Sequence, residues 1–317
     1  METPVIIPLP NTTVADILRA LQKAREDGGA VALGRVLTLV ITTTDDKVEK
    51  VVAAANEASR EHPMRIIVIN NVSDANQTVP LNAELRLGGD AGASEVVVLN
   101  ASDELVGDPQ ALINGLLLPD APMVAWWPDA APLRMSETSL GRVAGHRIAD
   151  TITASNPVEL LRILAEAYEP GDVDLGWTRI TQWRALLAAT LDTGVNLGLR
   201  GATVAGALDN SAPILLAAWL RSELKVPVEL VLEGKSELGN IIRVEIMTDA
   251  GSIVLERTEP GFARLAQPGQ PDHAISLPLR GLGDCLTEEL RRLDADIVFG
   301  RVLTEGIPLL VAESELI

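Results

Sequence analysis

Residue types that hold metals, form disulfides or build aromatic cores are scarce in this chain. Its 317 residues include one cysteine, three histidines, five tryptophans, two phenylalanines and one tyrosine. The lone Cys285 excludes an internal disulfide and a multi-cysteine metal site. His62, His146 and His273 lie far apart and lack zinc-binding spacing, so we expect no metal. We interpret Cys285 as a small buried apolar residue and His62 as a helix-end residue.

Positive charge is also in short supply. The chain has 26 Lys and Arg against 44 Asp and Glu, a formal net charge of −18. This balance disfavours binding to nucleic-acid phosphates and adsorption to anionic membranes. The sequence also lacks an apolar run of about 18 residues, and its N-terminal residues do not have the basic and apolar regions of a signal peptide. We therefore expect a cytoplasmic protein with no nucleic-acid or membrane partner.

The glycine patterns that bind phosphates are missing as well. In a dinucleotide-binding fold, G-x-G-x-x-G follows the first strand. Here Gly28, Gly29 and Gly34 precede the apolar run 35–43, and TTDDK follows it. The GKS at 234–236 lacks the earlier glycine of a phosphate loop and leads into another strand, which favours a hairpin turn. With no G-x-S-x-G elbow either, we expect no cofactor and no catalytic residue.

Apolar and amphipathic segments alternate along the chain, as is typical of an α/β fold. In the first half we predict strands at 35–43, 64–70, 81–87, 95–100, 123–127 and 146–152, and helices at 14–27, 46–60, 108–117 and 156–168. Residues 128–142 are expected to be irregular. In the second half we predict helices at 175–192, 212–224 and 284–305, and strands at 201–208, 227–233, 240–248, 252–258 and 273–279.

The length favours two domains. The turn-rich segment EPGDVD at 169–174 is the best boundary, which gives an N-terminal α/β domain over 1–168 and a C-terminal α/β domain over 169–317. We expect both domains to have mixed sheets. Similar landmarks in the two halves, including DAG at 90–92 and at 249–251, suggest a duplication; chance recurrence of α/β units is the alternative.

Four phrases in order resemble one known protein family. They are GGAVALGRVLTLVI (28–41), ASREHPMRIIVI (58–69), LLLPDAPMVAWWP (116–128) and DLGWTRITQWRALLA (174–188). Together they are similar to the glucose-6-phosphate dehydrogenase assembly proteins of the OpcA family, actinobacterial type. The resemblance implies a non-catalytic partner of glucose-6-phosphate dehydrogenase that promotes its active oligomer or conformation in the oxidative pentose phosphate pathway. The redox-responsive cysteines of cyanobacterial relatives do not carry over, because Cys285 stands alone.

Neighbouring tryptophans at 126 and 127 raise the question of which surface binds the partner. In a strand, successive side chains point to opposite faces, so one of Trp126 and Trp127 can enter the core. The other would face outward, before Pro128 and an irregular segment. Because tryptophan is enriched at binding hot spots, it is a candidate anchor for the dehydrogenase.

The predicted helix 175–192 carries further partner-binding candidates. Trp177 and Trp183 lie on it about 120° apart, at roughly 100° per residue. Arg179 precedes Trp183 by four residues, so its guanidinium could stack over that ring, while Arg184 lies on a different face. The alternative is that these tryptophans are core or domain-interface residues.

A second class of function uses other residues. Arg142, His146 and Arg147 form a candidate anion site, with which a sugar-phosphate or nucleotide-binding sensor or enzyme could use an α/β cleft. They could equally be solvated basic positions that offset local acidic charge. A third reading is a scaffold that binds the dehydrogenase without changing its rate.

Overall fold

The computed structural model describes residues 5–28, 35–72, 81–87, 95–153, 156–192, 197–234 and 237–313. Contacts between Cα atoms divide the chain into two compact units. The first contains Met1–Ala149 with Gly281–Asp294, and the second contains Asp150–Arg280 with Ala295–Ile317. The limits of these units differ from the domain boundary that the sequence suggests between residues 168 and 169. That domain boundary stays a prediction.

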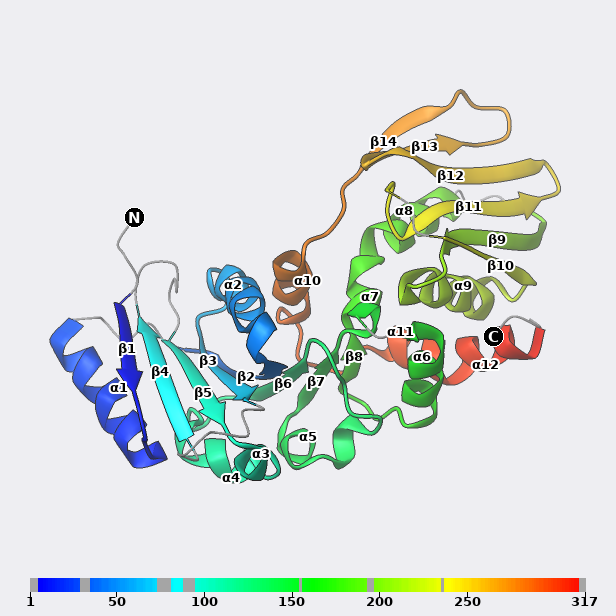
Figure 1. The fold of residues 1–317 in the computed structure, drawn as a ribbon. Helices are drawn as coiled ribbons and strands as arrows, with labels where there is room; N and C mark the ends of the chain where they lie inside the picture. Colours follow the sequence, from blue (N-terminus) through cyan, green and yellow to red (C-terminus); the bar gives the residue numbers. More distant parts are fainter. Residues whose placement is uncertain are drawn as a thin grey trace. The chain divides into compact units, whose positions relative to one another are not determined.

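A parallel sheet forms the centre of the first unit (Figure 1). Its strands are β2 (Leu37–Thr44), β3 (Met64–Asn71), β5 (Glu95–Ala101), β6 (Met123–Trp127) and β7 (His146–Ala149). They lie in the order β5-β3-β2-β6-β7, and each neighbouring pair is parallel. Numbered along the chain this is 3-2-1-4-5, the order of a doubly wound dinucleotide fold. The apolar β-branched runs predicted these strands because a parallel sheet is buried on both faces.

Two antiparallel strands extend this sheet past β5. They are β4 (Leu81–Leu87) and β1 (Val5–Leu9), so the sheet is mixed, as expected. The alternating burial of β4 fits the polar and apolar alternation of its sequence.

Helices cover both faces of the first sheet. In Figure 1, α2 (Val48–Ser59) and α10 (Leu282–Glu289) lie on one face, while α3 (Asp103–Val106), α4 (Pro109–Ile113) and α5 (Ser139–Val143) lie on the other. The helix α1 (Val14–Gly28) lies by the β1–β4 edge, and its start is capped by Thr13, whose hydroxyl accepts the Asp16 N–H at 3.2 Å. The short helices η1 (Asp45–Lys47) and η3 (Asn114–Leu116) complete predicted helical segments.

The expectation that 128–142 is irregular is wrong in part. Residues Met135–Glu137 form the short helix η4, and α5 begins at Ser139. The Thr138 hydroxyl accepts the Gly141 N–H at 2.9 Å, and this N-cap starts a helix that the surrounding prolines and glycine obscure in the sequence.

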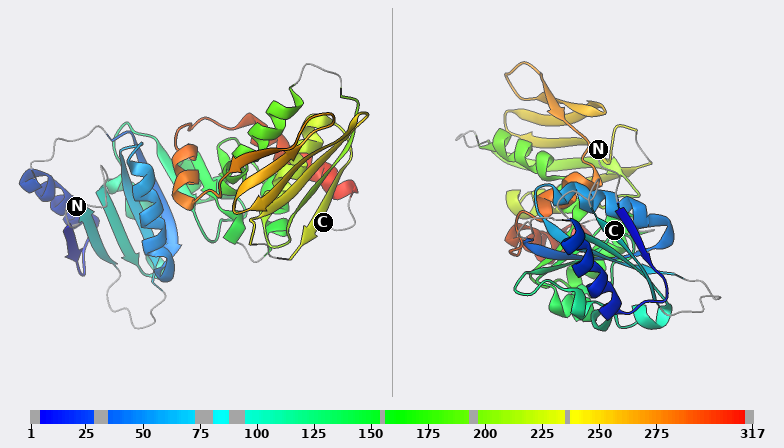
Figure 2. Two further views of the ribbon diagram at one scale, coloured as in Figure 1. Left: turned by 90° about the horizontal axis from the view of Figure 1, so that it is seen from above. Right: turned by 90° about the vertical axis from the view of Figure 1, so that its left-hand side faces the viewer.

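A second mixed sheet belongs to the second unit. Its order is β10-β9-β11-β12-β13-β14. The strands are β9 (Leu199–Ala207), β10 (Val228–Glu233), β11 (Ile241–Thr248), β12 (Gly251–Glu259), β13 (Gly261–Ala266) and β14 (His273–Leu277). Only β9 and β10 are parallel; from β9 through β14 every neighbouring pair is antiparallel. The left view of Figure 2 shows these later strands side by side.

The two sheets therefore have different strand orders, which counts against the suggested duplication. One sheet has the 3-2-1-4-5 parallel core, whereas the other is largely an antiparallel meander. The DAG at 90–92 lies outside the described residues. In its supposed counterpart, residues 249 and 250 form the turn between β11 and β12, and Gly251 begins β12.

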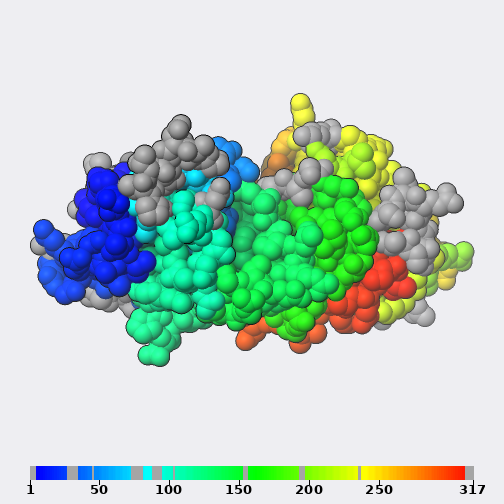
Figure 3. Space-filling view, turned by 60° about the horizontal axis from the view of Figure 1, so that its bottom comes forward, coloured from blue at the N-terminus to red at the C-terminus, as the bar shows by residue number. Residues whose placement is uncertain are grey.

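Helices of the second unit pack around α9 (Ser211–Leu224), almost all of which is buried. α9 contacts β9 and β10, and it is surrounded by α6 (Pro157–Glu166), α7 (Leu175–Arg179), η6 (Val302–Gly306) and α12 (Ile307–Glu313). Figure 3 shows the C-terminal segment, in red, against green residues that include α6. Gly306 allows the π-helical turn η6 to approach α9, because a Cβ there would lie 2.5 Å from the Ala218 carbonyl oxygen.

Two long predicted helices are interrupted. The segment 175–192 contains α7 and α8 (Thr181–Leu191), which are separated at Ile180. The segment 284–305 divides into α10 of the first unit and α11 (Ile297–Arg301) with η6 of the second. Within the described ranges, no helix combines the length and the apolar character needed to cross a bilayer.

Candidate functional site

The carboxyl ends of β2 and β6 mark the position, here called the crevice, where a dinucleotide fold binds its ligand. In doubly wound sheets the ligand occupies the point where strand order reverses, here between these two strands. At this point Thr43 Oγ1 donates a hydrogen bond to Asp129 Oδ2 at 2.8 Å. The Lys47 ammonium lies 3.1 Å from Asp129 Oδ1. A polar link formed by the chain itself thus joins the two strand ends.

This link has the wrong chemistry for a pyrophosphate. A dinucleotide needs glycine amides that allow the backbone to approach and a helix N-terminus facing the phosphates. Here the sequence has no glycine between Gly34 and Gly88, and a carboxylate lies at the crevice. Its negative charge would repel a phosphate, and Lys47 is already paired with it. These residues do not fit a bound dinucleotide in the usual position.

Both side chains of the tryptophan pair in β6 are buried. Trp126 has no exposed surface and Trp127 is 5 % exposed. The expectation that one ring faces outward is wrong, because a parallel sheet with helices on both faces buries both sides of β6. A partner-binding role for Trp126 or Trp127 stays a prediction. The Trp126 indole N–H is itself buried without an acceptor among the described residues.

Trp177 lies in an aromatic and charged cluster of the second unit. Its indole Nε1 donates to Asp296 Oδ2 at 2.8 Å, and its ring centroid lies 5.6 Å from that of Phe299. The Arg184 guanidinium stacks over the Trp177 ring at 3.5 Å. Asp296 also caps α11, since its other oxygen accepts the Val298 and Phe299 N–H groups. The cluster fastens α7 to the start of α11.

Trp183 and Arg179 do not form the expected stacked pair. Arg179 instead makes two hydrogen bonds to Asp150, at 2.6 and 2.8 Å, and the guanidinium over Trp183 is that of Arg257, 5.5 Å from the ring centroid. The interruption at Ile180 breaks the helical spacing that would place Arg179 near Trp183. Trp177 and Trp183 are both buried, which agrees with the core alternative for the tryptophans.

The three residues of the candidate anion site are close in sequence but differ in environment. Arg142 is exposed and donates to the Glu137 carbonyl oxygen. His146 is buried, with Nε2 3.0 Å from Glu289 Oε1. Arg147 is buried and donates to the Ala144 carbonyl oxygen at 3.0 Å, close to the end of α5. An anion site at these residues stays a prediction.

Sequence reasoning missed two buried carboxylates next to Arg179. Asp174 precedes α7, where its Oδ1 accepts the Gly176 N–H at 2.7 Å and its Oδ2 accepts the Thr151 N–H at 2.8 Å. Burial, with the nearby Asp150 charge, raises the pKa of Asp174 to about 7. An Asp before an apolar helical segment is an N-cap signal, so the sequence could have identified Asp174 as the cap of α7. The sequence gives no signal that Asp174 lies close to Asp150.

Other residues singled out by sequence have local structural contacts. Cys285 is buried in α10, as expected. His62 follows the end of α2, and its Nε2 lies 3.1 Å from the Thr287 carbonyl oxygen. Across the described ranges, His, Cys, Asp and Glu side chains form no group that could hold a metal ion.

The fold and these strand ends define a class of protein. It is a two-unit α/β protein in which the Asp129 carboxylate lies where a doubly wound sheet would bind a dinucleotide. Two family models match the chain in order. The glucose-6-phosphate dehydrogenase subunit N-terminal domain matches residues 55–166, and the corresponding C-terminal domain matches residues 170–303. The chain belongs to this OpcA-type family of glucose-6-phosphate dehydrogenase subunits. In the comparison with curated proteins, none matches.

Solved structures with a similar fold are oxidoreductases. An oxidoreductase from Sinorhizobium meliloti is 10% identical, with a TM-score of 0.52 over 88% of this chain and 97% of that one. A dehydrogenase from Chromobacterium violaceum is 10% identical, with a TM-score of 0.51 over 88% and 95% of the two chains. The 3-ketoreductase KijD10 from Actinomadura kijaniata is 11% identical, with a TM-score of 0.50 over 87% and 96%. At these identities the likeness concerns the fold alone.

Proposed function

We propose that this chain is a non-catalytic partner of glucose-6-phosphate dehydrogenase that promotes the enzyme's active oligomer or conformation. The observation that carries the proposal is the ordered match of two dehydrogenase-subunit domains over residues 55–166 and 170–303. The role places the chain in the oxidative pentose phosphate pathway and in the cytoplasm with the enzyme.

The crevice of the first unit supports a non-catalytic role. Hydride-transfer enzymes with doubly wound sheets depend on a dinucleotide held at the strand-order reversal. In this chain Asp129, Thr43 and Lys47 are linked at that position. The sheet order is that of such enzymes, but the residues at this position do not fit a dinucleotide.

Activation by a binding partner has a thermodynamic requirement. The chain can shift the dehydrogenase toward its active state only if it binds that state more tightly than the inactive one. The stimulation should therefore saturate when every binding site on the enzyme is filled.

The test is NADPH production by the purified dehydrogenase of the same organism, with and without this chain. We expect a dose-dependent rise that saturates at a fixed molar ratio, with co-elution of the two proteins. Co-elution without a change in rate would replace the proposal with a scaffold. No co-elution and no change in rate would refute the partnership and return attention to a ligand of the chain itself.

A further inference from the structure

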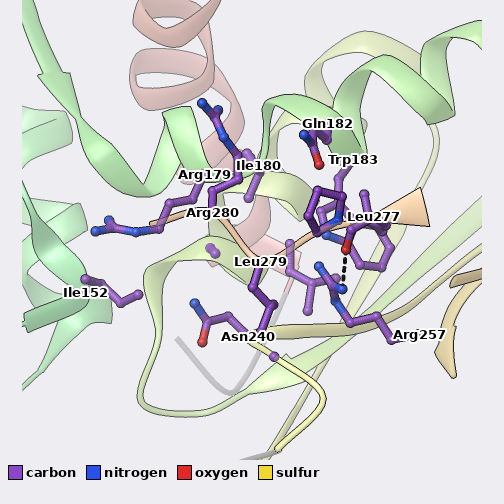
Figure 4. Close-up of a pocket in the computed structure, with 14 residues that line it drawn as sticks. Ile152, Arg179, Ile180, Gln182, Trp183, Asn240, Arg257, Leu277, Leu279 and Arg280 are labelled. Atoms are coloured by element: carbon purple, nitrogen blue, oxygen red, sulfur yellow. Dashed lines mark hydrogen bonds between the residues drawn. The ribbon is translucent and has the colours of Figure 1, made fainter. Parts of the chain in front are cut away.

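A cavity of about 230 Å³ lies within the second unit, at the junction of α7, α8 and the sheet (Figure 4). Ile180, Gln182 and Trp183 line it from the α7–α8 region, and Asn240 from the start of β11. In Figure 4, Arg257 and Trp183 lie on one side and Arg179 and Ile152 on the other. The remaining lining residues are Ala212, Gly239, Ile241, Leu277, Pro278, Leu279 and Arg280.

The charge of this cavity is opposite to that of the chain. Three arginines line it, Arg179, Arg257 and Arg280, and none of its lining residues is acidic. The chain as a whole carries a net charge of −18. Asp150 neutralises Arg179 through two hydrogen bonds, whereas Arg257 has no carboxylate partner in the described part of the chain.

Arg257 carries the inference, because it is a buried cation with too few partners. Its side chain is 6 % exposed, and it donates one hydrogen bond, to the Leu277 carbonyl oxygen at 2.6 Å. Its Nε is buried without an acceptor, and no carboxylate pairs with it in the described part of the chain. Burying an unpaired charge is strongly unfavourable, so an anion bound beside this guanidinium would offset that cost. Burial lowers the pKa of Arg257 for the same reason.

Neighbouring groups give the cavity further binding capacity. Arg280 donates to the Thr178 carbonyl oxygen at 2.7 Å, which holds its guanidinium at the wall. Gln182 Oε1 is buried without a donor among the described residues, so it can accept a hydrogen bond from a ligand hydroxyl. Ile152, Ile180 and Trp183 supply apolar surface. The cavity thus combines cationic donors with one free acceptor and an apolar wall.

We propose that this cavity binds a small oxyanion, a phosphate monoester or a carboxylate, with Arg257 and Arg280 as its donors. Planar guanidinium groups match both kinds of anion through paired N–H donors. The volume lies below the roughly 300–1,000 Å³ of drug-sized sites, so the ligand is a small metabolite. This site is independent of the proposed dehydrogenase partnership, and it lies in a different unit from Arg142, His146 and Arg147.

The experiment titrates inorganic phosphate, and separately succinate, into the full chain at constant ionic strength. The readouts are the melting temperature and tryptophan fluorescence, since Trp183 lines the cavity. We expect a saturable change with at least one probe; the probe that binds more tightly identifies the ligand class. Arg257→Gln and Arg280→Gln should each weaken binding by about tenfold or more, as expected for loss of a charge-assisted hydrogen bond.

Arg264→Gln is the matched control. Arg264 lies in the same sheet, is partly exposed, and pairs with Glu256 and Asp272 outside the cavity. Its removal should leave binding unchanged. If Arg257→Gln fails to fold, the half-exposed Arg280 position still tests the site. The proposal is overturned if neither probe binds saturably, or if binding is equally strong in the wild type and the folded cavity variants.

Discussion

Asp174 shows how a single buried carboxylate can set the pH dependence of stability. Its two oxygens accept N–H groups of Thr151 and Gly176, yet the side chain is buried beside the Asp150 charge. Burial and that charge raise its pKa from 3.8 to about 7. The folded protein therefore binds a proton here at pH values where the unfolded chain does not.

The sign of the effect follows from this proton. Between about pH 4 and 7 the folded state holds the proton more tightly, so the free energy of unfolding contributed by Asp174 falls as pH rises through that window. Asp174→Asn cannot ionise, but its amide NH2 cannot accept the second of the two N–H groups, which costs the variant stability at every pH. Its stability relative to the wild type should therefore rise by on the order of a few kcal/mol as the pH increases across the window. Urea unfolding at pH 4.5, 6 and 7.5 measures this difference.

A control separates this effect from the general pH dependence of the chain. Asp249→Asn removes an exposed carboxylate that pairs with Arg200, and its unfolding curve should follow the wild type at each pH. A constant offset for Asp174→Asn, without a change in slope, would mean that Asp174 is ionised throughout the window.

At the scale of elements, one carboxylate fastens several parts of the first unit together. Glu95 at the start of β5 is buried and contacts Arg25 of α1, Arg65 of β3 and Arg35 before β2. Burial opposes its ionisation, but the hydrogen bond from Arg25 and the charges of Arg35 and Arg65 hold the pKa of Glu95 below its usual value. One carboxylate thus serves as the shared counter-ion of three arginines.

Removing that charge should destabilise the first unit. Glu95→Gln leaves the buried Arg65 without its counter-ion, and the expected loss is about 3 to 5 kcal/mol in the free energy of unfolding. Glu159→Gln, which breaks an exposed pair with Arg162 on α6, should lose less than about 1 kcal/mol. Urea titration compares the two variants. Equal losses would show that the Glu95 cluster does not hold these elements together.

Local signals predicted most elements, and they failed where tertiary contacts decide. The runs 64–70 and 123–127 are strands because apolar β-branched or aromatic residues fill both faces of a parallel sheet. The amphipathic pattern over 284–305 predicted one helix. In the structure one helix ends at Glu289, and another begins after the cap residue Asp296. β13 was missed because its sequence GFARLA contains Gly and Ala, which are depleted in strands, and because it follows β12 after a tight turn.

The candidate sites were less predictable than the elements. The neighbouring tryptophans suggested that one ring faces a partner. In a sheet covered on both faces, however, both rings are buried, and the order of the strands in the sheet is needed to predict this. The cavity arginines lie far apart in sequence. They line one cavity because the fold brings Arg257 of β12 to the end of β14, where it donates to the Leu277 carbonyl oxygen, a tertiary contact that the local pattern does not encode.

The whole molecule combines a doubly wound parallel sheet order with residues that do not fit a dinucleotide at the usual position. It aligns with oxidoreductases over 87% or 88% of its length at TM-scores of 0.50 to 0.52. At their sequence identity of 10% or 11% the likeness concerns the fold alone, and the Asp129 carboxylate at the strand-order reversal does not fit a dinucleotide there. The site chemistry should decide, because fold does not imply function.

We therefore expect that NAD and NADP do not stabilise the chain. The titration is best done with Arg257→Gln, so that anion binding in the second unit does not contribute, and it is read as melting temperature. A ligand at a hundredfold excess over its Kd would stabilise the folded state by about 2.7 kcal/mol, which is easily detected. The purified dehydrogenase, which uses the cofactor, is the positive control. A saturable rise with either dinucleotide would mean that the crevice opens despite Asp129, and the non-catalytic role would have to be given up.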